Sequence, residues 1–141
     1  PIIAAGGISD GRTMAAAFAL GAEGVQMGTR MLSCLESPVH MNWKEAIVNA
    51  RETDTIFLNQ RHSPALRALR TERSERLADM EENIFGEFGD PQKLYFGGDM
   101  TAAIALSGQV AGRIGAIRPI AEIIGETVEE FSETIDRLSD G

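Results

Sequence analysis

Two glycine-containing turns hold the residues whose types and spacing could do chemistry. Gly6-Gly7 follows the apolar run 1–5, and Gly28-Thr29 follows the short segment 24–27. Because glycine has no Cβ over its backbone N–H, such turns can donate hydrogen bonds to a phosphate, and a nearby helix N-terminus adds partial positive charge. Alternatively, both are ordinary turns where glycine is common for its backbone freedom. Two such turns separated by one helix favour phosphate binding.

A strand–turn–helix–strand unit over residues 1–32 must position these turns. The run 1–5 lacks polar alternation, as in a parallel strand covered on both faces. Asp10 stands where a helix N-cap is expected, and Gly21 can end the helix in a left-handed conformation. The stripe that we expect to pack on the sheet has helical spacing and consists of Met14, Ala17, Phe18 and Gly21.

Three segments of the chain resemble a known family. Residues 4–12 and 21–30 are similar to the end of the barrel in nitronate monooxygenases, formerly called 2-nitropropane dioxygenases, and FMN-dependent enoyl-acyl-carrier-protein reductases share this motif. Residues 107–112, Ser-Gly-Gln-Val-Ala-Gly, resemble the Gly-Gln-x-Ala-Gly-Leu-Ile segment of the same group, except that Arg113 stands in place of the leucine. The likeness is weak between residues 55 and 100.

The resemblance implies an FMN-dependent oxidoreductase that oxidises alkyl nitronates with O2. Two alternatives stay open: an FMN-dependent enoyl reductase with a nicotinamide donor, and a barrel fragment that binds a non-flavin phosphorylated metabolite and is inactive alone. The implied catalytic base is a histidine on an earlier strand, so the catalytic residues of this chain are unknown. The residues expected to contact the cofactor are Gly6, Gly7, Gln26, Met27, Gly28, Thr29 and Gln109.

The fold class that follows is α/β, the C-terminal part of a TIM (β/α)8 barrel. With 141 residues, the chain is shorter than the roughly 250 residues of such a barrel, so we expect its last two βα units and a mostly helical extension. Three parts are predicted: the end of the FMN-binding barrel over 1–52, a lid-like small-domain region over 53–98, and C-terminal helices that pack back on the barrel over 99–141.

Composition limits the partners. A net charge of −8 argues against binding to nucleic acid or to an anionic membrane surface, and no apolar run approaches the roughly 20 residues that span a bilayer. The single cysteine, Cys34, allows no internal disulfide, which is typical of a cytoplasmic protein. We expect the Cys34 side chain to be buried in the fold. His40 and His62 lack partners at metal-ligand spacing, so no metal site is predicted.

The elements after residue 32 are predicted from caps and periodicity. Ser37-Pro38 indicates a helix over about 38–51 that carries Trp43, and exposure of this helix would make a homodimer plausible. Residues 53–58 are rich in β-formers and should be extended. Ser63-Pro64 indicates a second helix, over about 65–82, with arginines and glutamates at i,i+3 and i,i+4 spacing.

The last third of the chain is predicted to be helical after a loop over 84–98. Asp99 should cap a helix of small residues that ends near Arg113. A short helix from Pro119 should end at Gly125, and a capping box of Thr127 and Glu130 should start the final helix. The face that this helix should bury consists of Val128, Phe131, Ile135 and Leu138.

Overall fold

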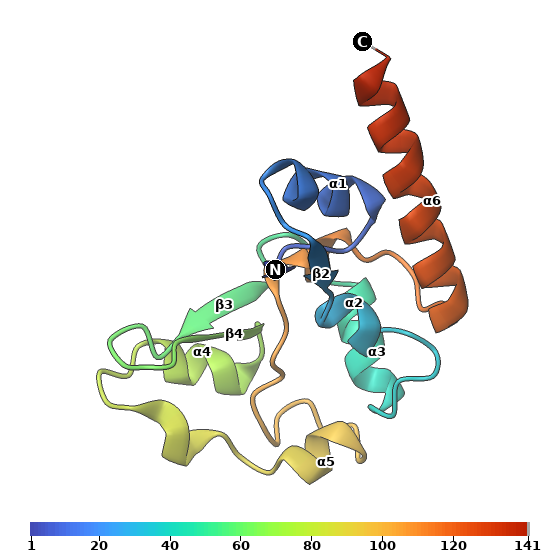
Figure 1. Ribbon diagram of the computed structural model, residues 1–141. Coiled ribbons are helices and arrows are strands. Elements are labelled where there is room, and N and C mark those ends of the chain that lie inside the picture. Colours follow the sequence, from blue (N-terminus) through green and yellow to red (C-terminus); the bar gives the residue numbers. More distant parts are fainter. Residues whose placement is uncertain (141) are drawn as a thin grey trace.

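The parallel strand pair predicted at the start of the chain is present. A computed structural model describes residues 1–140 (Figure 1), in which β1 (Ile3–Ala5) pairs with β2 (Gly24–Gln26) in parallel. The helix α1 (Gly11–Ala19) connects the two strands. Asp10 caps this helix and Gly21 has a positive φ of 99°, so both helix ends are as predicted.

The stripe predicted for α1 is only partly right. Gly11 and Ala15 are the buried positions of the helix, and Gly21 is exposed. This face packs on the C-terminal helix α6 (Ile120–Ser139), which lies beside α1 in Figure 1. Phe18 does belong to it, with its ring edge-on to Phe131 at a centroid distance of 5.0 Å. The small residues Gly11 and Ala15 let α6 approach α1 closely, so α6 covers this face of the helix.

The helix predicted over 38–51 begins later than expected. A short helix, α2 (Thr29–Leu32), is followed by a loop, and α3 (Met41–Val48) starts after His40, whose Nδ1 accepts from the N–H of Asn42. The buried Lys44 Nζ donates to the carbonyls of Leu35 and Ser37 at 2.9 and 2.7 Å, which holds the preceding segment as a loop. Trp43 is fully buried, so α3 presents no exposed tryptophan, and the homodimer stays a prediction.

A strand replaces the first part of the helix predicted over 65–82. The extended prediction for 53–58 is confirmed by β3 (Thr55–Leu58), which pairs antiparallel with β4 (Leu66–Leu69). Helix α4 (Glu72–Ala78) starts only at the Thr71 cap. Arg67, expected to pair along a helix, instead donates across the hairpin to Thr55 Oγ1 at 3.1 Å.

The small-residue helix predicted over 100–113 is also wrong. Ala103 and Leu106 form isolated antiparallel bridges to Gly89 and Ala68, and the Leu69 N–H donates to the Ala105 carbonyl at 2.9 Å. The alanines allow this extended segment to pass close to both neighbours. The Asp99 side chain caps only a turn, and the one helical piece is the 3-10 turn η2 (Gln109–Arg113).

Two short helical elements interrupt the region predicted as a loop over 84–98. They are the 3-10 turn η1 (Ile84–Glu87) and the helix α5 (Pro91–Tyr95), which Asp90 caps. Ile84 and Leu94 are fully buried. Burial of these two side chains orders a segment whose glycines alone indicate a loop.

Helix α6 is continuous through Gly125, so the predicted break there is wrong. The Thr127 hydroxyl donates to the Ile123 carbonyl inside the helix rather than capping a new one. The buried positions are Ile123, Thr127 and Thr134, whereas three of the four residues predicted to be buried, Val128, Ile135 and Leu138, are exposed. The C-terminal end of α6 projects beyond the rest of the chain in Figure 1.

Two clusters of buried apolar side chains support these elements. The larger cluster surrounds Trp43 and Ile47 of α3 and includes residues from the later segments, namely Leu69, Leu94, Ala103, Ala105, Val110, Ala111 and Ile114. The smaller cluster lies under the hairpin and consists of Leu58, Ala68, Leu77, Ile84 and Ile104. The division of the chain at residues 52 and 98 stays a prediction.

Candidate functional site

The two glycine turns open into one hollow of about 220 Å³. Both turns reach it because β1 and β2 are parallel and end at the same edge of their sheet. Five of the predicted site residues line it: Gly6, Gly7, Gln26, Gly28 and Thr29. The remaining lining residues are Ala5, Ile8, Gly108 and Val110, so every side chain around the hollow is uncharged.

The backbone of the first turn requires glycine. Gly6 and Gly7 have φ angles of 87° and 77°, in the left-handed region that L side chains rarely adopt. A Cβ added at Gly6, Gly7 or Gly28 would meet no atom within 4 Å, so these positions face open space. The backbone N–H groups of Gly7, Ile8 and Gly28 donate to no acceptor within residues 1–140. The turns therefore offer free donors to a ligand.

A third segment completes the wall of the hollow. The N–H of Gly108 donates to Thr29 Oγ1 at 2.7 Å, which fixes this glycine beside the second turn. Its neighbour Ser107 is held from the core, because Trp43 Nε1 donates to Ser107 Oγ at 3.3 Å. Gly108 and Val110 are absent from the predicted site residues. The similarity of residues 107–112 to a family motif was the signal that could have indicated them.

Two predicted site residues lie elsewhere. Met27 is half-buried and Gln109 is exposed, and neither belongs to the lining of the hollow. Gln109 is the first residue of η2 and is exposed, whereas its neighbours Val110 and Ala111 are buried. Contact of Met27 and Gln109 with a cofactor stays a prediction.

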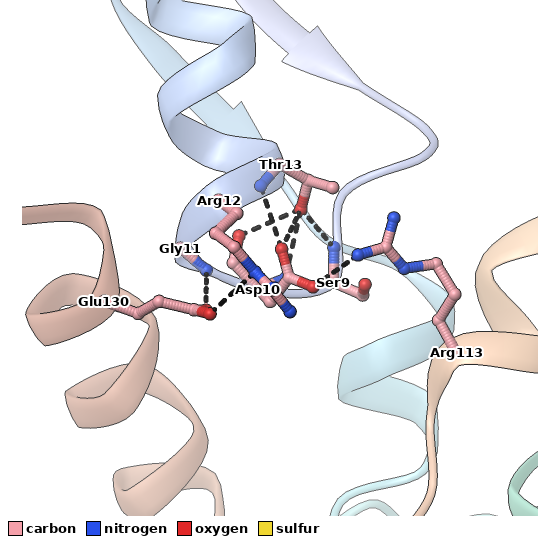
Figure 2. A network of polar contacts seen from close by, with 7 residues as sticks. All are labelled: Ser9, Asp10, Gly11, Arg12, Thr13, Arg113 and Glu130. Atoms are coloured by element: carbon pink, nitrogen blue, oxygen red, sulfur yellow. Dashed lines mark hydrogen bonds and ion pairs between the residues drawn. The ribbon is translucent and has the colours of Figure 1, made fainter. Parts of the chain in front are cut away.

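A network of polar contacts surrounds the start of α1, just beyond the first turn (Figure 2). The Asp10 carboxylate accepts from the Thr13 N–H and from Thr13 Oγ1, both at 2.8 Å. Its second oxygen forms an ion pair with an Arg113 guanidinium nitrogen at 2.8 Å. From α6, Glu130 accepts from the Gly11 N–H at 2.8 Å and pairs with Arg12 at 3.0 Å. Residues from three segments thus hold one helix end.

The pKa of Asp10 reflects this network. Partial burial on its own would raise the pKa. Hydrogen bonds from Thr13 and the positive charges of Arg113 and Arg12 outweigh this effect, so the pKa lies below its ordinary value of 3.8. Asp10 is therefore ionised at neutral pH and can form the ion pair with Arg113. Beside it, Ser9 Oγ is buried and has no hydrogen-bond partner within residues 1–140.

A comparison with known protein families places the chain. The family model described as "Nitronate monooxygenase" matches residues 1–130. The chain belongs to the nitronate monooxygenase family. The resemblance expected from residues 4–12, 21–30 and 107–112 is thereby confirmed.

This chain spans less than half of the length of the individual relatives that it matches. Probable nitronate monooxygenases from Staphylococcus saprophyticus and Staphylococcus aureus are 40% identical over 84 residues, which is 60% of this chain and 24% of each relative. The structure of FabK from Thermotoga maritima is similar over 99% of this chain and 47% of its own, with 41% identity and a TM-score of 0.90.

A more distant structure shows the fold alone. A nitroalkane oxidase from Streptomyces ansochromogenes is 23% identical, with a TM-score of 0.73, over 97% of this chain and 41% of its own. These neighbours and the family assignment confirm the mixed α/β fold class. No helix within residues 1–140 has the length and apolar character needed to span a bilayer.

Proposed function

We propose that this chain supplies the FMN phosphate site of a flavin-dependent oxidoreductase, as the last two βα units of a (β/α)8 barrel. One observation supports this most strongly: the turns at Gly6-Gly7 and Gly28 line the same hollow at the ends of two parallel strands, and the N–H groups of Gly7, Ile8 and Gly28 have no acceptor within residues 1–140. In barrels of this type, the loops after the last two strands are a frequent phosphate site.

The residues of the hollow fit a phosphate group. The N–H groups of Gly7, Ile8 and Gly28 can donate to its oxygens, and no lining carboxylate would repel its negative charge. A Cβ at Gly28 would occupy the space that the phosphate needs. Ile8 and Val110 give the hollow an apolar side. Bound FMN would supply the redox chemistry, and this chain would fix its position.

The oxidation of alkyl nitronates with O2 is the first candidate reaction. The match of the nitronate monooxygenase model over residues 1–130 favours it. None of the residues that line the hollow is a general base, and we expect the base of this reaction on a part of the barrel that this chain does not contain. The chain's own contribution is then binding and orientation of the cofactor.

Reduction of an enoyl thioester with a nicotinamide donor is the second candidate reaction. The similarity to FabK at 41% identity extends over 99% of this chain, whereas the match to probable nitronate monooxygenases extends over 60%. Both reactions would use the same phosphate site. The two candidates therefore differ in residues beyond the hollow.

Binding and spectroscopy of the purified full-length protein test the proposal. Visible absorption bands of oxidised flavin, with FMN released into the supernatant on heating, would support it. Calorimetry should show binding of FMN and much weaker binding of a plain sugar phosphate. A colourless protein that binds sugar phosphates but not FMN would contradict it and favour a phosphorylated-metabolite site.

Turnover assays separate the two reactions. The full-length protein with bound FMN is assayed with an alkyl nitronate and O2, and in parallel with an enoyl thioester and NADH or NADPH. Oxygen consumption with the nitronate alone supports the first candidate, and nicotinamide oxidation that depends on the thioester supports the second.

A further inference from the structure

The three walls of the hollow are connected to one another by three different contacts. The first and second turns are joined by the parallel pairing of β1 with β2. The second turn is joined to the Gly108 wall by the hydrogen bond to Thr29. The remaining side, between the first turn and the segment after Gly108, is bridged by the ion pair of Asp10 with Arg113 at 2.8 Å.

The two partners of this ion pair are close in sequence to the walls. Asp10 is the N-cap of α1 and follows Gly7 by three residues, and Arg113 ends η2, which begins directly after Gly108. Figure 2 shows Arg113 reaching across to Asp10 from a separate segment of the chain. A shift of either segment would therefore change the separation between Gly7 and Gly108.

The ion pair suits a positioning role more than a stabilising one. The Arg113 side chain is 44% exposed and that of Asp10 is 23% exposed, and pairs at such positions add little to the free energy of unfolding. Asp10 is also fixed by Thr13, so the arginine meets a carboxylate of defined orientation. A pair with one preoriented partner can set a geometry without a large contribution to stability.

We propose that Arg113 is a positioning residue that, through Asp10, sets the distance between the Gly6-Gly7 turn and the Gly108 wall for binding of the FMN phosphate. This inference rests on the proposed function. Arg113 itself does not touch the hollow.

A double-mutant cycle in the full-length protein tests the role. Arg113→Leu removes the charge, and Asp10→Asn removes the charge while keeping a side-chain oxygen that caps α1. Each variant should raise the Kd for FMN by about two- to five-fold, and the double variant should show no further loss. Arg113→Lys should restore most of the affinity. Arg51→Leu, which breaks the exposed Arg51–Asp54 pair elsewhere, is the matched control.

Two readouts separate positioning from a general structural effect. The thermal midpoint of the FMN-free protein should shift by no more than about 2 °C in Arg113→Leu. The phosphorus-31 chemical shift of bound FMN should change in Arg113→Leu and return with Arg113→Lys. An unchanged Kd in Arg113→Leu and Asp10→Asn, with normal FMN binding by the wild type, overturns the positioning role alone. Failure of the wild type to bind FMN overturns the proposed function and this role with it.

Discussion

Thr29 Oγ1 accepts a hydrogen bond from the Gly108 N–H at 2.7 Å, although the two residues are 79 positions apart. This contact joins the second glycine turn to the segment before η2, so the hollow has three walls rather than two. Glycine at position 108 leaves just enough room for this hydrogen bond, because an added Cβ would lie 3.2 Å from Thr29 Oγ1. The side chain of Thr29 thus organises the site and also lines it.

Replacing Thr29 by valine should weaken this junction. The substitution keeps the shape of the side chain but leaves the half-buried N–H of Gly108 without its acceptor, which costs about 1–3 kcal/mol. Urea unfolding measures the loss of stability, and calorimetry should show weaker FMN binding. Thr29→Ser keeps the hydroxyl and is the control. Equal stability and affinity in Thr29→Val and wild type would contradict the role of this contact.

Replacing Gly28 by valine should abolish retention of FMN without unfolding the protein. The φ angle of Gly28 is −95°, so a side chain is allowed there, and it would project into the open space of the hollow. The flavin absorbance of the purified full-length protein measures the loss. Gly115→Val is the control, since Gly115 also faces open space but does not line the hollow. A normal flavin content in Gly28→Val would count against the phosphate site.

Replacing Gly11 by alanine should destabilise the contact between α1 and α6. A Cβ at Gly11 would lie 2.3–2.6 Å from backbone atoms of α6, which cannot move aside like a flexible side chain. Overpacking of this kind costs about 1–3 kcal/mol. Thermal unfolding of the full-length protein should show a lower midpoint.

Gly125→Ala is the matched control for this substitution. Gly125 lies within α6 and faces open space, so alanine should stabilise the helix by about 0.5–1 kcal/mol. Opposite signs for the two glycine-to-alanine changes are the expected result. A neutral Gly11→Ala would show that α6 does not pack on α1 as the structure has it.

Acid should remove the contribution of Asp10 to stability. Because the pKa of Asp10 is lower in the folded protein than its ordinary value of 3.8, its stabilisation is present above that value and is lost as the pH falls through the folded pKa. The wild type should therefore have a higher thermal midpoint than Asp10→Asn at pH 6–7. The difference should shrink as the pH falls below 3.8 and disappear once Asp10 is protonated, because it then resembles asparagine in charge. A difference that persists at low pH would show that it does not arise from the carboxylate charge.

The sequence by itself determined the start of the chain and much of the site. Gly6-Gly7 has positive φ angles that only glycine adopts readily, Asp10 caps the helix from its own side chain, and the two short apolar runs pair in parallel. The turn and the cap are decided within a few residues, and the parallel pairing within one strand–helix–strand unit, so a local pattern is enough to predict them. Five of the seven predicted site residues consequently lie around one hollow.

The tertiary structure alone decided the elements for which local preferences were nearly balanced. Residues 66–69 and 102–106 have helical spacing or small side chains, but pairing of Leu69 with Ala105 makes both segments extended. Helix α6 continues through Gly125 although glycine disfavours a helix interior. Local preferences amount to about 1 kcal/mol or less per residue, and the backbone pairing and burial of apolar area that outweigh them depend on partners distant in sequence. For the same reason, only the fold could bring Gly108 to Thr29 and Arg113 to Asp10.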